Sequence, residues 1–397
     1  MTGFLIIADD LTGSNDTGVQ FARRGFETVI SIETEPDPNA TVCVMDTESR
    51  HIAPAEAARR VEGAARGSGV GHFYKKTDST LRGNVGVELA ALLRATGGGV
   101  LPFVPAYPHA GRTTRGGCQH VQGKPLHETS FAHDPREPIE SGSIPVILTR
   151  DAEVAVRVVA RDKLASWSPA DCADPCICVF DAETEGNLER IADRLVQVGL
   201  LWRTAGAAGF AEKVAERLDL PRSAPEKPER RGPLLIVNGS LQETALAQVR
   251  RGLEAGIDGL RLTPEMLSAG EPTARRVVGP LLLYTVATPE ERAQYAEAAR
   301  RQGIEDVCGS VAEALGGLTA ALMEREPAPG SLAVFGGDTA VAVLRALGGT
   351  TMRPHGELWP GVIESTMPVG GRSVTVVTKS GGFGPEDLVA RLAERYH

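Results

Sequence analysis

The chain has 397 residues, more than one hydrophobic core usually supports, and its 42% hydrophobic and 23% charged residues are typical of a soluble protein with two globular domains. The net charge of −9 argues against nucleic acids and anionic membrane surfaces as general partners. Because no apolar run approaches the ~18 residues of a membrane span or the pattern of a signal peptide, we expect a cytoplasmic protein.

The first predicted strand, residues 4–8, leads into a polar segment, residues 9–18, and then into a helical pattern. In open α/β sheets, ligands bind beyond the carboxyl ends of the strands, where this segment would lie. Acidic and hydroxyl side chains are costly to bury there unless they are bonded to something. We therefore predict a site for a hydroxylated ligand. The alternative is a helix N-cap at Ser14 or Asn15 with solvated neighbours.

Strands and helices alternate through the first half of the chain. The predicted strands are Phe4–Ala8, Thr41–Met45, Phe73–Lys76, Val100–Val104, Ile144–Leu148 and Cys176–Phe180. The predicted helices include Ala53–Arg66, Val85–Arg94 and Glu185–Val198. This alternation predicts a mostly parallel sheet flanked by helices.

A second polar segment follows the predicted strand at residues 73–76. Arginine and lysine side chains can bind a carboxylate there, and hydroxyl and aspartate groups can bond to sugar hydroxyls. The residues that could make these contacts are Lys76, Thr77, Asp78, Ser79 and Arg82. The alternative is a helix cap at Ser79 or Thr80 with a solvated Lys75.

Arg50 lies just beyond the strand predicted at residues 41–45. The carboxyl ends of parallel strands meet at one edge of a sheet, so Arg50 and both polar segments should converge. An acidic segment, basic groups and many hydroxyls at one edge predict a pocket for a polyhydroxy acid.

The region 102–133 is irregular and rich in Gly, Pro and His, which is typical of a functional lid or a hairpin excursion. Residues 117–124 within it have the pattern of a hairpin crossing the ligand cleft. No metal site is predicted from its histidines, because they lack the helical H-x-x-x-H spacing. Further along, we interpret Cys172, Cys176 and Cys178 as buried thiols that act as small hydrophobes, in preference to a metal site.

Residues 221–232 contain three prolines and many charges without an apolar period, so they predict an exposed linker. The linker divides the chain into a first domain, residues 1–220, which carries the predicted acid pocket, and a second domain, residues 233–397. Two domains joined by a hinge suit an enzyme whose ligands meet in the cleft between them.

The second domain repeats the alternation of strands and helices. Its predicted strands are Leu234–Val237, Leu281–Val286, Ser331–Phe335 and Val374–Thr378. Its predicted helices are Gln242–Ala255, Glu290–Arg301, Thr339–Leu347 and Glu386–Tyr396. The expected fold is therefore two α/β domains, each with a mostly parallel sheet.

Three strands of this second domain end in glycine-containing loops, residues 238–240, 336–339 and 379–384. Glycine lets backbone amides approach an anion closely, and a helix start adds partial positive charge. We favour a cradle for nucleotide phosphates over plain turns. The sequence has no P-loop and no dinucleotide fingerprint, so the nucleotide would bind in a different way.

Four motifs of this chain resemble, in the same order, those of the four-carbon acid sugar kinases. They are Ala8–Gly13 with Asp16–Gly18, Lys75–Asn84, Pro105–Pro108 and Lys379–Gly384. The resemblance runs from residue 4 to about residue 390. It implies an N-terminal acid-sugar domain, a C-terminal ATP domain and phosphate transfer from ATP to the 4-hydroxyl group of a tetronate.

The resemblance also implies site residues. Contacts to the acid sugar would come from Asp10, Arg50, Lys76, Thr77, Asp78 and Ser79. Contacts to ATP would come from Ser240, Gly336, Gly337, Asp338, Thr339, Gly381, Gly382, Phe383 and Gly384. This chain has Asp338 where the family often has Glu. It has glycine at position 382 where 3-oxo-tetronate kinases usually have Asn, which favours D-threonate or D-erythronate as the substrate.

We thus predict a kinase that uses ATP and Mg²⁺. Phosphoryl transfer by such an enzyme needs cationic groups, the metal ion and an oriented hydroxyl group. The candidates for the general base are Asp9, Asp10 and Asp78. The carboxylate of the substrate would be held by Arg50, Lys76 or Arg82, and amides of the glycine loops would hold the phosphates. The alternatives are a nicotinamide-dependent sugar-acid dehydrogenase and a nucleotide- or sugar-acid-binding protein without turnover. Assembly into a homo-oligomer stays open.

Overall fold

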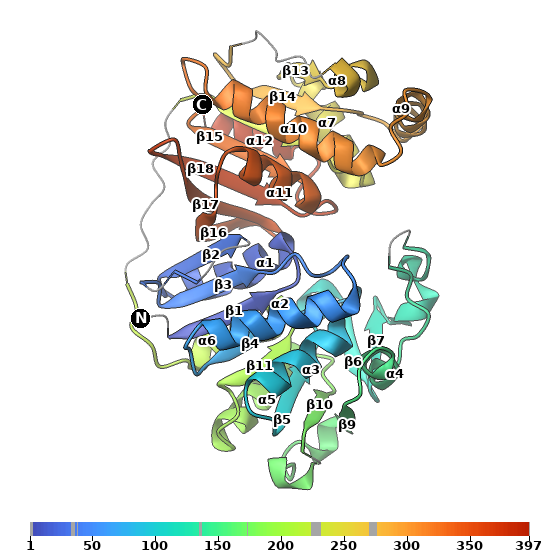
Figure 1. The fold of residues 1–397 in the computed structure, drawn as a ribbon, viewed down its shortest axis with the longest axis vertical. Coiled ribbons are helices and arrows are strands. Elements are labelled where there is room, and N and C mark those ends of the chain that lie inside the picture. The colour runs from blue at the N-terminus through green and yellow to red at the C-terminus, as the bar shows by residue number, and fades with distance from the viewer. Residues whose placement is uncertain are drawn as a thin grey trace. The chain divides into compact units, whose positions relative to one another are not determined.

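The computed structural model describes residues 3–32, 36–37, 39–134, 137–172, 174–223, 232–269 and 276–396. The chain divides into two compact units, Met1–Pro225 and Glu226–His397 (Figure 1). Of the linker predicted at residues 221–232, residues 224–231 lie outside the described part. Within the described part, every helix is too short or too polar to cross a lipid bilayer.

The first unit is built on a parallel sheet with the strand order β2-β3-β1-β4-β11-β5-β10-β9. Its strands are β1 (Phe4–Ala8), β2 (Thr28–Ile32), β3 (Val42–Asp46), β4 (Phe73–Lys76), β5 (Val100–Val104), β9 (Ala155–Val159), β10 (Cys176–Phe180) and β11 (Arg203–Gly206). The strands β1, β5 and β10 are fully buried apolar runs, and β3 is apolar up to its last residue, Asp46, as expected when helices cover both faces of a parallel sheet. The prediction of a mostly parallel sheet is confirmed for this unit.

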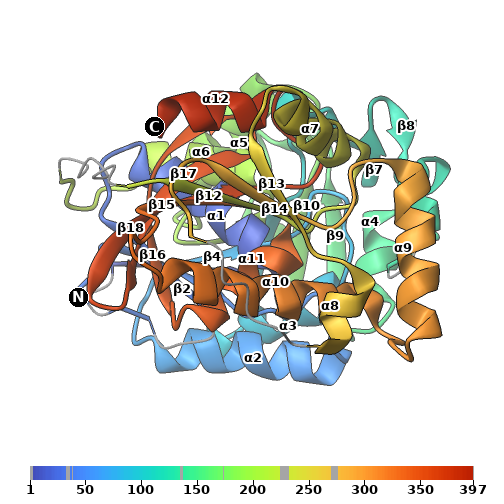
Figure 2. The ribbon, with the colours of Figure 1, turned by 90° about the horizontal axis from the view of Figure 1, so that it is seen from above.

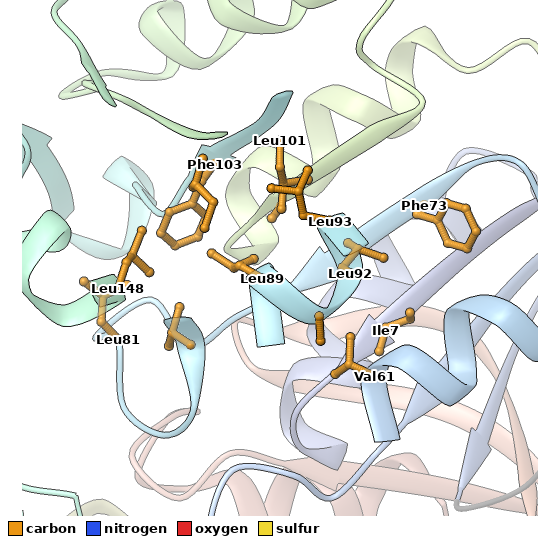
Figure 3. Close-up of a cluster of buried hydrophobic side chains, with 14 of the residues drawn as sticks. Ile7, Val61, Phe73, Leu81, Leu89, Leu92, Leu93, Leu101, Phe103 and Leu148 are labelled. Carbon is orange, nitrogen blue, oxygen red and sulfur yellow. The ribbon is translucent and has the colours of Figure 1, made fainter. Parts of the chain in front are cut away.

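Helices cover both faces of this sheet. They are α1 (Leu11–Ala22), α2 (Pro54–Gly67), α3 (Val85–Ala95), α4 (Ile144–Thr149), α5 (Glu185–Gln197) and α6 (Ala208–Arg217). On one face, α2, α3 and α4 enclose a core that includes Ile7, Leu89 and Phe103 (Figure 3). Alternate residues of β1 point to the other face, where Phe4 stacks on Phe21 of α1 with ring centroids 5.4 Å apart.

The excursion after β5 forms a small antiparallel sheet with three short 3₁₀ helices. Its elements are η1 (Pro108–Ala110), β6 (Arg112–Arg115), β7 (Cys118–Val121), β8 (Lys124–Pro125), η2 (Leu126–Glu128) and η3 (Ser130–His133). The hairpin predicted at residues 117–124 is present, with its turn at Gln122 and Gly123, both in the left-handed region. Two further 3₁₀ helices, η4 (Arg161–Lys163) and η5 (Pro169–Asp171), follow β9.

The second unit has the strand order β13-β14-β12-β15-β18-β17-β16. Its strands are β12 (Leu234–Asn238), β13 (Asp258–Arg261), β14 (Leu281–Tyr284), β15 (Ser331–Phe335), β16 (Thr351–Trp359), β17 (Val362–Val369) and β18 (Arg372–Lys379). The strands from β13 to β18 in this order are parallel, and β17 pairs antiparallel with both β18 and β16. This mixed sheet agrees with the prediction of a mostly parallel one.

The helices of the second unit also lie on both faces of its sheet. They are α7 (Glu243–Glu254), α8 (Pro264–Ala269), α9 (Pro289–Arg301), α10 (Val307–Met323), α11 (Gly337–Ala346) and α12 (Leu388–Arg395). Figure 2 shows α7 and α12 on one side of the strands and α10 and α11 on the other. The core under α7 and α12 includes Ile236, Val249, Phe335 and Leu392.

The strand predicted at residues 144–148 is wrong, because this segment forms helix α4. Pro145 lies in its first turn, where the missing N–H of proline costs nothing. Ile144, Ile147 and Leu148 have helical spacing and are buried against the core. A five-residue apolar run cannot distinguish a buried strand from a short buried helix.

The polar segment predicted at residues 9–18 is mostly helical rather than a loop. Helix α1 begins at Leu11, and its N-cap is Asp10 rather than Ser14 or Asn15. The N-cap of α3 is Asn84, so neither Ser79 nor Thr80 caps that helix. Only Asp9 and Asp10 therefore separate β1 from α1, which fixes both carboxylates tightly at the sheet edge.

Candidate functional site

Three neighbouring strands of the first unit, β3, β1 and β4, end at the same edge of the sheet. Ala8 pairs with Asp46, and Ile7 pairs with Lys75, so the residues that follow these strands start level with one another. The carboxyl edge of an open α/β sheet is where such folds bind ligands. The structure thus brings together both polar segments that the sequence analysis singled out.

Arg50 joins the two consecutive aspartates at this edge. Its Nε lies 2.7 Å from Asp9 Oδ2, and its Nη1 lies 2.6 Å from Asp10 Oδ2. Burial by itself would raise the pKa of Asp9, but the charges of Arg50, Lys75 and Lys76 outweigh it and hold this pKa below its ordinary value. Burial disfavours the charged guanidinium of Arg50, yet the aspartates raise its pKa. Arg50 and Asp9 therefore both stay ionised.

Asp10 also caps helix α1, since its Oδ1 accepts a hydrogen bond of 2.8 Å from the Gly13 amide. The Lys76 ammonium lies against the same turn: a methyl group at position 13 would be only 2.6 Å from Lys76 Nζ. Lys76 is 6% exposed, and no hydrogen bond or ion pair joins its ammonium to the residues that the structure describes. A buried cation beside the positive end of a helix is a suitable place for an anion.

Asp78 and Arg82 form a second ion pair at this edge, with Arg82 Nε 2.6 Å from Asp78 Oδ2. The same carboxylate oxygen accepts a hydrogen bond from Thr80 at 2.5 Å, and Arg82 Nη1 lies 3.2 Å from Asp134. Burial would raise the pKa of Asp78, but Arg82 and Arg50 hold it far below its ordinary value. Asp78 is therefore a firmly ionised group whose partners are already in place.

The remaining N-terminal candidates, Thr77 and Ser79, lie in the loop after β4. Thr77 is buried and its hydroxyl has no hydrogen-bond partner among the described residues, while its amide donates to Gly206 in β11. The Ser79 carbonyl accepts a 2.8 Å hydrogen bond from Gln119 of β7. The excursion thus holds this loop in place through a side chain that the sequence analysis did not identify.

Two charged residues near the site were also missed. Glu88 of α3 pairs with Lys75 beneath the aspartates. It is the one acid in an otherwise apolar helix face, and this pattern could have identified it from the sequence. Arg112 of β6 lies near Asp78, whose charge acts on it. Its Nε is buried without a partner in the described part of the chain, and burial lowers its pKa. Nothing in its irregular sequence context indicated this position.

In the second unit, the loops after β12, β15 and β18 pack against one another. A methyl group at Gly381 would lie 2.6 Å from Ser240 Oγ, and one at Gly336 would lie 3.4 Å from Ser240 Cβ. A methyl group at Gly239 would overlap Thr339 Oγ1. The three predicted glycine loops therefore form a single cluster.

Helix α11 begins at Gly337, directly beyond β15. Gly336 has φ +107°, a conformation open to glycine and strained for other residues. The first turn of α11 contains the exposed Asp338 and the buried Thr339. Amides at a helix start, reached through a glycine turn, suit a phosphate group.

The loop after β18 is held by buried side chains beneath it. Lys379 Nζ donates to the Gly381 carbonyl at 2.8 Å and to the Phe383 carbonyl at 3.2 Å. Gln248 of α7 donates to the Phe383 carbonyl at 3.0 Å. Burial lowers the pKa of Lys379 to about 7. Phe383 itself is 38% exposed, while Gly382 has no atom near the position of an added methyl group.

Family models match both units of the chain. A model described as "Sugar-binding N-terminal domain" matches residues 4–214, and one described as "Nucleotide-binding C-terminal domain" matches residues 235–389. The chain resembles two crystal structures along nearly its whole length, of proteins from Salmonella typhimurium LT2 and Haemophilus influenzae. Their TM-scores are 0.80 and 0.75, at 22% and 21% identity, so this likeness establishes the fold.

Named relatives align over almost the full chain. The chain is 34% identical to the D-threonate kinase of Salmonella typhimurium, covering 97% of this chain and 96% of that protein. It is 31% identical to the D-erythronate kinase of Heliobacterium modesticaldum, covering 99% and 97%. It is 30% identical to the 3-oxo-tetronate kinase of Pseudomonas fluorescens, covering 97% and 95%.

Proposed function

The chain belongs to the family of four-carbon acid sugar kinases, and we propose that it transfers the γ-phosphate of ATP to the 4-hydroxyl group of a four-carbon sugar acid. D-Threonate or D-erythronate is the favoured substrate. Of the three relatives described above, the two with the higher identity are named for D-threonate and D-erythronate. In addition, this chain has glycine at position 382, where 3-oxo-tetronate kinases usually have asparagine.

The observation that supports this function best is the unpaired ammonium of Lys76. Lys76 is 6% exposed, lies against the start of α1 and makes no direct ion pair with the described residues, although its charge acts on Asp9, so an anionic ligand would complete its contacts. A sugar-acid carboxylate provides that charge. Arg82, and Arg112 with its unpaired Nε, would add further donors to the same ligand.

We assign the general base to Asp10. Both aspartates pair with Arg50, but the side chain of Asp10 is 22% exposed, whereas that of Asp9 is only 3% exposed. Asp78 is a poorer base because its two arginine neighbours hold its pKa so low. Asp10 would accept the proton of the 4-hydroxyl group as its oxygen attacks the γ-phosphorus and the bond to ADP breaks.

The glycine cluster of the second unit would bind ATP. Backbone amides at Gly337 and at the glycines of the loop 381–384 would contact the phosphates, while the exposed Phe383 ring offers a surface for the base. Mg²⁺ binds one or two carboxylates together with substrate phosphates, and Asp338 is an exposed carboxylate in this cluster that fits this preference. The ion, when bound, would neutralise charge on the phosphates.

The test is turnover by the full chain with ATP, Mg²⁺ and each of the three acids in turn. We expect ADP release that requires D-threonate or D-erythronate, and a product whose phosphorus couples to the protons on C4. ADP release that is indifferent to all three acids would reject the proposed acceptor. Reduction of NAD⁺ or NADP⁺ by the same acids would instead support a dehydrogenase. Binding of ATP and a sugar acid without ADP release would support a binding protein without turnover.

A further inference from the structure

Three cysteine side chains converge on one point of the first unit, away from the site described above. The sulfur atoms of Cys172, Cys176 and Cys178 all lie within 4.8 Å of one another, and those of Cys172 and Cys178 are 3.1 Å apart. All three are free thiols. In the part of the chain that the structure describes, no other group of three His, Cys, Asp or Glu residues brings its ligand atoms this close.

The local fold explains the convergence. Cys176 and Cys178 are two residues apart on β10, so their side chains point to the same face of the sheet. Ile177 and Val179, between and after them, belong to the core on the opposite face. Cys172 comes from the segment before the strand, directly after η5, whose start is fixed by a capping box between Ser168 and Asp171.

Packing alone accounts poorly for this arrangement. A buried free cysteine often acts as a small hydrophobe, which describes Cys176 and Cys178 by themselves. Cys172, however, is only partly buried and is supplied by a loop. A disulfide between Cys172 and Cys178 would need sulfur atoms about 2.05 Å apart and would leave the third thiol unused.

We propose that Cys172, Cys176 and Cys178 form a trithiolate site for a soft metal ion of the Zn²⁺ or Cu⁺ class. With Zn–S bonds of about 2.3 Å, two sulfur ligands of one tetrahedral ion are about 3.8 Å apart, which small side-chain shifts would provide here. Binding forms three metal–sulfur bonds, breaks three S–H bonds and releases three protons to solvent, with no change of oxidation state. Soft thiolates select these ions over Mg²⁺.

A positive charge lies beside the cluster. Arg157 of β9 is level with Cys178 in the pairing of β9 with β10, and its guanidinium donates to the carbonyl of Asp171, next to Cys172. Three thiolates around a divalent ion leave a net negative charge. Arg157 would offset part of that charge in the metal-bound site.

The position of the cluster indicates a structural ion. Cys176 is the first residue of β10 and pairs with Val100 and Ala155, the first residues of β5 and β9. The cluster therefore lies toward the amino-terminal edge of the sheet, opposite the carboxyl edge that holds Asp10 and Lys76. An ion there would fasten the loop around η5 to β10 and would stabilise the fold without contacting substrate.

The experiment titrates the full chain, reduced with a phosphine and stripped of metal, with Zn²⁺, Cd²⁺ or Cu⁺ alone. We expect one equivalent of Cd²⁺ to produce thiolate-to-metal charge-transfer absorption. Zn²⁺ at ~100 times its Kd should raise the Tm by about 5–10 °C. Cys172→Ser should weaken binding at least ~10-fold, as expected for loss of one ligand. Cys308→Ser, which removes an exposed cysteine of α10, should bind as the unchanged protein does.

Zinc X-ray absorption of the unchanged protein gives a readout that does not depend on folding of a variant. A coordination shell with three sulfur atoms supports the site, and a shell without sulfur overturns it. Equal affinity of the Cys172→Ser variant and the unchanged protein would also overturn it. So would a Cys172–Cys178 disulfide that persists under the reductant.

Discussion

Lys75 and Glu88 form an ion pair of 2.9 Å whose side chains are 0% and 2% exposed. Lys75 also donates to the carbonyl of Lys76 at 2.8 Å, and Ser49, next to Arg50, donates to the Glu88 carboxylate. Burial raises the pKa of Glu88, and the Lys75 ammonium opposes that shift. The pair thus connects β4, α3 and the loop after β3 directly beneath the proposed acid-sugar site.

Glu88→Gln should destabilise the protein by about 3–5 kcal/mol, because it removes the direct ion-pair partner of the buried Lys75 ammonium. Urea denaturation at neutral pH measures this. Glu297→Gln is the control, since Glu297 pairs with Arg301 on an exposed helix surface and should cost less than about 1 kcal/mol. Equal effects of the two variants would show that the Lys75–Glu88 pair adds nothing.

Lys76→Met should raise the KM for the sugar acid about 10- to 100-fold, as expected for the loss of a charged hydrogen bond of roughly 1.5–3 kcal/mol. The KM for ATP should stay nearly constant, because Lys76 belongs to the proposed acid site. Steady-state kinetics with each substrate varied in turn measures both constants. Lys213→Met removes a similarly buried cation, paired with Glu185 and Glu189, and should leave both KM values unchanged. An unaltered acid KM for Lys76→Met would contradict the assignment.

Asp10→Asn should lower kcat by about 10²–10⁴-fold if Asp10 is the general base. Asparagine can still accept the hydrogen bond of Gly13, so α1 keeps its cap. Asp306→Asn is the matched control, because Asp306 caps α10 through a 3.0 Å hydrogen bond from Gly309 and is not among the residues assigned to either site. A loss of kcat that occurs with Asp78→Asn but not with Asp10→Asn would move the base to Asp78.

Buried strands were predictable to the residue where an apolar run ends abruptly, as in Phe4–Ala8, Val100–Val104 and Cys176–Phe180. Their carboxyl ends then located the polar edge of the sheet without further information. The antiparallel strands β16 and β17 escaped prediction because polar residues interrupt their apolar residues, so neither strand forms a continuous apolar run, although β17 is mostly buried. Such strands depend on their neighbours in the sheet more than on local sequence.

Individual partners were harder to predict than their location. The sequence predicts that Asp9, Asp10 and Arg50 lie near one another, but only the folded structure shows one guanidinium joining both aspartates. The contribution of Gln119 arises from an irregular excursion whose path no local pattern specifies. Long-range contacts of this kind depend on how loops close over the sheet, which periodicity does not encode.

Gly381→Ala should raise the KM for ATP at least ~10-fold and leave the acid KM nearly unchanged. Its methyl group would lie 2.6 Å from Ser240 Oγ and 2.9 Å from Gln242 Cγ, so these side chains must move and would disturb the glycine cluster. Gly317→Ala in α10 is the control, because a methyl group there meets no atom within 4 Å and alanine favours a helix. An ATP KM that is the same for both variants would remove this loop from the nucleotide site.

Lys379 should make stability depend on pH above neutrality. Burial lowers its pKa to about 7, while the unfolded chain holds this proton up to its ordinary pKa of 10.5. The penalty for burying the charge is therefore fully present below pH 7 and fades as pH rises from 7 toward 10.5. Over that window, the free energy of unfolding should rise relative to Lys379→Met by up to about 1.4 kcal/mol per pH unit. Urea denaturation of both proteins at pH 7, 8 and 9 measures the slope, with Lys213→Met as control. Loss of the Lys379 hydrogen bonds in Lys379→Met would lower the free energy of unfolding by the same amount at every pH. If the free energies of unfolding of the two proteins change in parallel with pH, Lys379 stays charged beneath the loop and the prediction is wrong.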